Sequence, residues 1–272
     1  MIDYGIVLSR VHIECDLLTD FELDAANERM LSAMGRFATT SAHVVRGRHL
    51  RLACSVYVHE QTFRTWSHVF KMAALMQVEE AQRTSARLAT SLRARVDASS
   101  HPVNGHRDVP DEMLQVVDRI FVPVGADPSV FYAEEFELAE RAIGRQMSVL
   151  TTASDTGLTS ELAFGRRTAL VRMRNDVRHP TLGAGLMSSI ALPLNIPKQD
   201  LPGFAIALNT KEQSENTRAQ FVGSWCAHDS LENTLAFVCF LPNICVIDGI
   251  VAMLLQNFAM RVGWARGEFL GP

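Results

Sequence analysis

Hydrophobic and polar residues alternate in two stretches near the amino terminus. The first alternation covers residues 11–17 and the second covers residues 50–58. A period of two places the apolar side chains on one face of a half-buried strand. We therefore expect a strand at each of these two places.

Apolar residues also recur every three or four positions, which predicts amphipathic helices packed on one side. Thr19 and Glu22 have the spacing of a capping box, so we expect the first helix to begin there. We expect the long second helix to break near residues 83–85. The predicted helices cover residues 20–38, 63–96, 136–150 and 250–269.

The second half of the chain contains a run of short apolar stretches separated by turn residues. Pro197 and Pro202 interrupt residues 195–203, which suits a connection. Strands that follow one another through short links favour antiparallel pairing. The sequence therefore predicts an α+β fold, with a mostly antiparallel sheet packed against several helices. Strands are expected at 169–174, 186–194, 204–208, 221–228 and 235–241.

The length of 272 residues fits a single α+β domain over residues 1–272. An alternative is two lobes, residues 1–98 and 112–272, because residues 99–111 are rich in turn formers and predict an exposed loop. No internal repeat is visible in the sequence.

Composition and charge exclude some classes of protein. Hydrophobic residues make up 47% and charged residues 21%, which is typical of a packed globular chain and not of a disordered one. Acidic residues outnumber basic ones by 30 to 26, so a dedicated nucleic-acid binder is disfavoured. All but three basic residues are arginines, whose planar groups pair with carboxylates and phosphates.

The cysteines, the apolar segment near the end and the start of the sequence indicate the cellular compartment that we expect for this protein. Five cysteines without a CxxC pair argue against a disulfide framework and a zinc ribbon. Residues 233–260 carry only Asp248 as a formal charge, but Pro242 and Asn243 predict a turn there instead of a membrane span. With no basic and apolar leader at the start, we expect a cytoplasmic protein without a membrane segment.

One cluster could carry nucleophilic chemistry. On a strand, Cys226 and His228 would share a face, and an imidazole near a thiol can stabilise the nucleophilic thiolate. Asp229 could meet the imidazole only if the strand ends there. The alternative interpretation is a core cysteine followed by a turn, because buried cysteine behaves as a small hydrophobe.

A second group of residues could bind an anion. Arg172 and Arg174 share one face of a predicted strand, and backbone amides at Gly183 and Gly185, beside His179, could approach a phosphate or carboxylate. The alternatives are a solvated or internally paired charge face and a glycine-rich hairpin.

Other polar residues predict no site. His101, His106 and Asp108 do not have the spacing of a metal site, and Glu79 and Glu80 point in two directions on a helix. No cofactor motif is found, and no cofactor or metal is predicted.

Three functions fit these observations, and the sequence does not decide whether the protein is an enzyme. An interaction or assembly protein, self-associating or bound to a protein partner, ranks slightly first because no catalytic motif is present. The first alternative is a small-molecule enzyme that uses the Cys226 and His228 pair with an arginine contact to a small anionic ligand. The second is phosphate or nucleic-acid binding through the arginines, which the charge balance disfavours.

Overall fold

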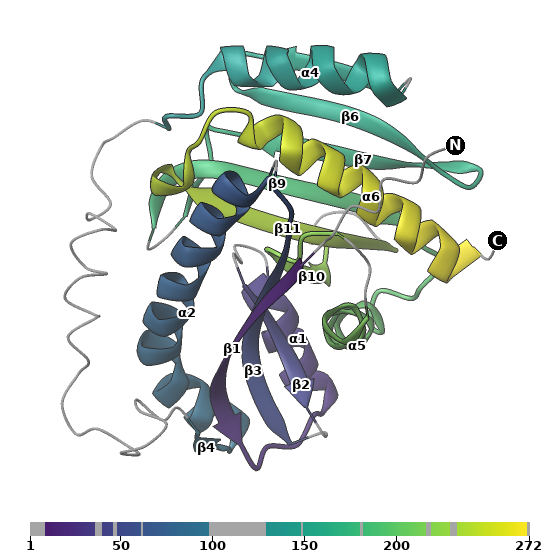
Figure 1. Ribbon diagram of the computed structural model, residues 1–272. Coiled ribbons are helices and arrows are strands. Elements are labelled where there is room, and N and C mark those ends of the chain that lie inside the picture. Colours follow the sequence, from purple (N-terminus) through teal and green to yellow (C-terminus); the bar gives the residue numbers. More distant parts are fainter. Residues whose placement is uncertain are drawn as a thin grey trace.

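The protein is described by a computed structural model that covers residues 9–35, 40–45, 48–60, 62–97, 129–147, 149–179, 182–215, 219–228 and 233–270. Two antiparallel sheets are flanked by helices (Figure 1), which confirms the predicted α+β class. The predicted loop at residues 99–111 and the histidines within it lie outside the described residues. The division into two lobes therefore stays a prediction.

The first sheet has four strands in the order β2-β3-β1-β4. Helices α1 and α2 pack with its apolar face, which Leu50 and Leu52 of β3 help to form. The opposite face carries the polar residues of the alternation predicted from the sequence. The elements are β1 (Ser9–Thr19), α1 (Ala25–Met34), β2 (Ser41–Val45), β3 (His49–Val58), α2 (Phe63–Leu92) and β4 (Arg95–Val96).

The second sheet has seven strands, six of them in the order β10-β11-β9-β7-β6-β5, with β8 paired to β9. Helices α4 and α6 lie along one of its faces (Figure 1). The elements are α4 (Ala133–Met147), β5 (Leu150–Ser154), β6 (Gly157–Phe164), β7 (Arg167–Arg174), β8 (Arg178–His179), β9 (Gly183–Pro193), α5 (Leu201–Ser214), β10 (Ser224–Ala227), β11 (Thr234–Pro242), the 3-10 helix η2 (Asn243–Cys245) and α6 (Ile250–Leu270).

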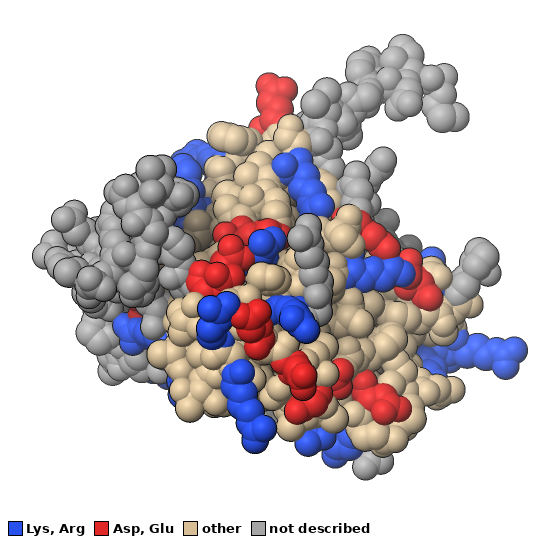
Figure 2. Space-filling model, turned by 90° about the horizontal axis from the view of Figure 1, so that it is seen from below, with Lys and Arg blue, Asp and Glu red and all other residues tan. Residues whose placement is uncertain are grey.

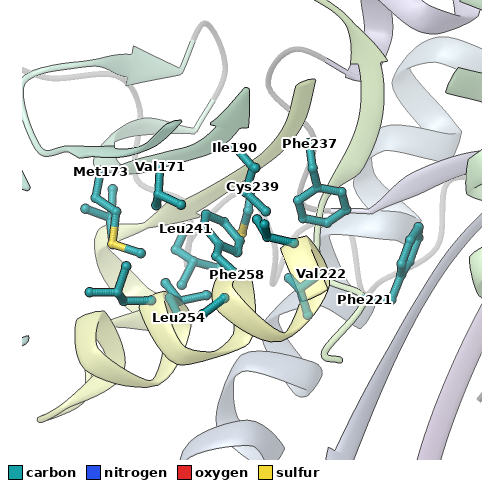
Figure 3. Close-up of a cluster of buried hydrophobic side chains, with 14 of the residues drawn as sticks. Val171, Met173, Ile190, Phe221, Val222, Phe237, Cys239, Leu241, Leu254 and Phe258 are labelled. Carbon is teal, nitrogen blue, oxygen red and sulfur yellow. The ribbon is translucent and has the colours of Figure 1, made fainter. Parts of the chain in front are cut away.

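The largest core lies between α6 and the second sheet. Leu254 and Phe258 of α6 point toward Val171 of β7, Ile190 of β9 and Leu241 of β11 (Figure 3). All five side chains are at most 1% exposed. Each buried aliphatic or aromatic side chain stabilises the fold by roughly 1.5–3 kcal/mol relative to an exposed one, so this layer holds the helix to the sheet.

The structure contains a repeat that the sequence does not show. The order β1-α1-β2-β3-α2 recurs as β9-α5-β10-β11-α6, and the strand orders β2-β3-β1 and β10-β11-β9 correspond. We call these the first unit and the second unit. Helices α1 and α5 pack together, α5 also contacts β2, and α1 contacts β10. Each unit therefore packs its first helix against the second strand of the other.

A short segment before β10 joins the two sheets. Phe221 exchanges two backbone hydrogen bonds with Ser55 of β3, at 3.0 and 2.8 Å. Beside it, the side-chain amide of Gln220 accepts from the N–H of Tyr57 at 2.5 Å and donates to its carbonyl oxygen at 2.8 Å. Residues 220 and 221 thus pair with the part of β3 that extends beyond β2, and they link the two units through the backbone.

A buried ion pair connects α5, α6 and β10. Glu212 and Arg261 are fully buried, with Nη2 of Arg261 2.7 Å from Oε1 of Glu212. Glu212 also accepts from Nε1 of Trp225 at 2.7 Å, and Arg261 donates to the carbonyl oxygen of Gln220 at 2.7 Å. The guanidinium lies over the ring of Phe237, 3.7 Å from its centre. These contacts offset much of the cost of removing two charges from water.

Most predicted elements are confirmed, with three corrections. The first helix begins later than the capping box, because the side chain of Asp24 accepts from the N–H groups of Ala26 and Asn27 at 2.9 and 2.8 Å. Helix α2 continues without a break through residues 83–85. Residues 204–208 form part of helix α5 and not a strand. A short apolar run does not distinguish a buried strand from a buried helix.

Candidate functional site

A cavity of about 420 Å³ lies between α1, α2 and the loop after β8. Its volume lies within the range of roughly 300–1,000 Å³ that is common for small-molecule sites. Of the thirteen described residues that line it, six are apolar and seven are polar or charged, so the cavity offers both kinds of contact. The lining residues are Met30, Ala33, Met34, Met76, Glu79, Glu80, Arg83, Thr84, Arg87, Leu88, Ser91, His179 and Leu182.

The two helices present these side chains because of their periodicity. Met30 and Met34 are four positions apart on α1, so they lie on one face of that helix. On α2, residues 76, 80, 84, 87 and 91 follow the same spacing and form one stripe toward the cavity. Methionine is flexible and polarizable, so a wall built from Met30, Met34 and Met76 adapts to apolar groups of different shape.

Glu80 is the polar residue whose environment is most unusual. Burial raises the pKa of Glu80 to about 7, and a contact with the hydroxyl of Thr40 lowers it only in part. Neither an ion pair nor a nearby positive charge compensates Glu80 within the described part of the chain. A carboxyl with this pKa changes its protonation state near neutral pH, and none of the described residues supplies a counterion for its ionised form.

The other charged residues of the cavity are partly neutralised or solvated. Arg83 forms an ion pair with Glu79 one helical turn away, and the Arg83 side chain is more than half exposed. Arg87 is also exposed, so it lies where water can screen its charge. The charge of Glu80 is therefore the one least compensated in the lining.

Of the predicted ligand-binding residues, the structure places His179 in this cavity. Nδ1 of His179 accepts from the N–H of Leu182 at 3.1 Å, which connects Leu182 to the end of β8. Its ring packs against Phe240 of β11, with the ring centres 5.0 Å apart. The adjacent positions of Glu79 and Glu80 on a helix do not predict a paired-carboxylate site, yet both residues line the cavity.

Neither Cys226 nor His228 of the predicted pair lines the cavity between α1 and α2. Cys226 is 1% exposed and packs with Met187, Ala236 and Val238 on the face of the second sheet opposite α6. His228 is half-buried, and its backbone N–H donates to Thr234 at 3.1 Å. Asp229 lies outside the described residues, so a catalytic role for these residues stays a prediction.

The predicted arginines lie on the same face of the second sheet as Cys226 but at a distance from it. Arg172 of β7 is three strands away from β10, which corresponds to about 14 Å. Arg174 is exposed and forms a bidentate pair with Asp176, at 2.8 and 2.7 Å. The hydrogen bonds from Arg174 lower the pKa of Asp176. An anion would therefore compete with Asp176 for Arg174.

Backbone conformation or close packing explains why glycine occurs at each of the two predicted positions. Gly183 has a φ of +75°, which the turn between β8 and β9 requires and which glycine adopts without strain. A Cβ atom at Gly185 would lie 2.3 Å from the carbonyl oxygen of Leu241, so β9 and β11 approach each other closely there. Anion binding at these glycines stays a prediction.

Comparisons of the chain with protein-family models, with curated proteins and with solved structures find no match. No helix within the described residues combines the length and the hydrophobicity that crossing a membrane requires. No group of three or more histidine, cysteine or acidic side chains in the described part of the chain could hold a metal ion.

Proposed function

We propose that the cavity between α1 and α2 binds a small organic cation, an ammonium group with an apolar body. The observation that carries this proposal is the carboxyl of Glu80, a half-buried residue that lines the cavity and has no cationic partner among the described residues. A bound ammonium group would supply the missing charge, and the methionines would cover its apolar body.

The charges of the cavity support a cation in preference to an anion. Glu79 already pairs with Arg83, and Arg87 lies in an exposed position. A charged pair in a partly dry cavity is stronger than one at the surface, because the local dielectric constant is lower. The strongest unpaired attraction in the lining is therefore that of ionised Glu80 for a positive group.

The test compares three ligands of equal length: hexylamine, hexanol and hexanoate. Isothermal titration calorimetry at pH 6 and pH 8 should show that hexylamine binds most tightly. Its affinity should rise by about tenfold between the two pH values, which is the ratio of the ionised fractions of a carboxyl with a pKa of about 7.

Two variants identify the group responsible. Glu80→Gln should weaken hexylamine binding and remove the pH dependence, because the amide has no charge at either pH. Glu137→Gln, at an exposed position of α4, should change neither. Tighter binding of hexanoate than of hexylamine, or unchanged binding in Glu80→Gln, would contradict the proposal.

We infer that the protein works in a reducing compartment such as the cytoplasm. All five cysteines lie within the described residues, no disulfide joins any of them, and four are buried. Burial raises the pKa of Cys54, of Cys245 and, to about 12, of Cys239, so these thiols stay protonated. Equal stability with and without a reductant in a thermal melt is the expected result.

A further inference from the structure

Strand β1 has one edge that is largely unpaired. It pairs with β3 along most of its length, but on its other side only Leu18 and Thr19 pair with β4. Among the described residues, residues 9–16 have no strand partner on that side. Most of them are exposed, including the apolar side chain of Val11 at 37%. A row of backbone hydrogen-bonding groups is thus available to another strand.

The pairing of β3 on its side away from β1 shows which backbone groups of β1 point to the unpaired edge. Ser55 exchanges its backbone hydrogen bonds with Phe221, which lies away from β1. Ser55 is opposite His12, so this pair makes no backbone hydrogen bonds with each other. The N–H and C=O groups of His12 therefore point to the free edge. By the alternation of an antiparallel strand, those of Arg10 and Glu14 do so as well.

The second unit shows what occupies the corresponding edge. Strand β9 is the counterpart of β1, and its side away from β11 pairs antiparallel with β7 through residues 187–191. Among the described residues, the first unit has only the two-residue strand β4 in the place of β7. Within the described part of the chain, the same fold thus completes its sheet in one unit and leaves one edge open in the other.

We propose that a second copy of this chain completes the sheet, with the two β1 strands pairing antiparallel around Ile13. In this register His12 faces Glu14 of the second copy and Arg10 faces Asp16 of the second copy. Arg10 and Asp16 then place opposite charges directly across two strands, and each His12 imidazole faces a carboxylate that can accept a hydrogen bond from it, which stabilises the pair. The two four-stranded sheets then form one continuous sheet across the dimer.

The register follows from the charges and from the backbone. Centring the pair on His12 places two histidines opposite each other, and centring it on Glu14 places two carboxylates opposite each other. Of these three centres, only Ile13 places different residues opposite each other at both charged positions, His12 with Glu14 and Arg10 with Asp16. It also places the outward backbone groups of His12 opposite those of Glu14, as a hydrogen-bonded pair requires.

Charged side chains around this edge are already ordered within one chain. Oε1 of Glu14 lies 2.9 Å from Nε2 of His12 and 3.4 Å from Nε2 of His43. Arg51 reaches Oε2 of Glu14 at 2.9 Å and also pairs with Asp16. Arg10 donates to the carbonyl oxygen of Gln213 at 2.5 Å. On the face of the molecule that Figure 2 shows, acidic and basic groups are likewise interspersed.

The first test is the oligomeric state of the full chain by sedimentation equilibrium over a wide range of concentration. A monomer–dimer equilibrium is expected. His12→Pro removes an outward N–H group together with the imidazole, and proline is tolerated at the free edge of an edge strand, so this variant should fold and stay monomeric. His12→Ala is the matched control, because it keeps the N–H group and should still dimerise. Circular dichroism verifies the fold of both variants.

The second test addresses the register. In a Cys15→Ser background, Ile13→Cys places two thiols opposite each other in a pair without backbone hydrogen bonds, where Cβ atoms are about 4.5–5.5 Å apart. Mild oxidation should then link the dimer covalently. A wild-type protein that is monomeric at every concentration overturns the proposal. So does a dimer that His12→Pro leaves intact, or a dimer that Ile13→Cys does not cross-link.

Discussion

At the scale of single residues, Glu80 shows how a fold changes the chemistry of a side chain. An exposed glutamate is ionised at neutral pH, but burial beside three methionines raises the pKa of Glu80 to about 7. The folded protein therefore holds a proton on Glu80 under conditions in which the unfolded chain releases it. This difference links protonation to stability.

Replacing Glu80 with glutamine should change how stability depends on pH. Because the folded-state pKa is raised from 4.5 to about 7, the folded protein loses stability as the pH rises between these values. Between pH 4 and pH 8, the free energy of unfolding of the wild type should fall by about 1–2 kcal/mol more than that of the Glu80→Gln variant. Urea unfolding at both pH values measures this difference, and parallel pH profiles of the two proteins would contradict it.

At the scale of secondary-structure elements, α5 and α6 are positioned by a polar network inside an apolar core. Asn209 and Glu212 of α5 both bind Trp225 of β10, and Arg261 of α6 binds Glu212. Directional bonds of this kind specify one orientation of the helices, whereas apolar packing alone tolerates several. The helix α5, which the sequence predicted in part as a strand, is held at three points in this way.

Removing one charge of this network should cost more than removing both. Arg261→Met leaves the Glu212 carboxyl in the core without its ion-pair partner, which should lower the free energy of unfolding by about 3–5 kcal/mol. Adding Glu212→Gln removes the unpaired charge and keeps an acceptor for Nε1 of Trp225, so the double variant should recover most of the loss. Guanidinium unfolding of the three proteins gives this comparison. Losses that simply add would show that the two residues are not coupled.

At the scale of the whole molecule, the two units are joined by the packing of α1 on α5 and by the backbone link between β3 and residues 220–221. Gly223 lies between this link and β10, with a φ of +125°. A Cβ atom there would lie 2.3 Å from the carbonyl oxygen of Val238. The link therefore depends on the absence of a side chain at this position.

Gly223→Ala should weaken both sheets together. Strain at such a position costs about 1–3 kcal/mol, and it acts on the segment that pairs with β3 and leads into β10. Hydrogen exchange should accelerate at Ser55 in the first sheet and at Ser224 in the second. Gly249→Ala is the control, because Gly249 has a φ of +79° but no atom within 4 Å of the added Cβ. Its effect should stay near the start of α6, and an effect of Gly223→Ala confined to β10 would argue against the coupling.

The periodicity of the sequence determined most of the elements. Strands β1 and β3 were predicted from alternation, and α2 and α6 from helical spacing, because the buried residues of each element recur with the period of a strand or a helix. Strands β2, β5 and β6 were not predicted, although buried and exposed residues alternate along β6 with the period of a strand. Residues 204–208 of α5 were predicted as a strand, because a short apolar run has no distinctive period.

The candidate site shows the same division. The sequence determined that Met30 and Met34 share a face and that Glu80 belongs to a helix, since both follow from local spacing. Only the tertiary structure decided that α1, α2, His179 and Leu182 surround one cavity, and that Glu80 is half-buried there without a counterion among the described residues. Burial and distance between segments far apart in the chain depend on how the elements pack. For the same reason, the repeat of the two units and the open edge of β1 became visible only in three dimensions.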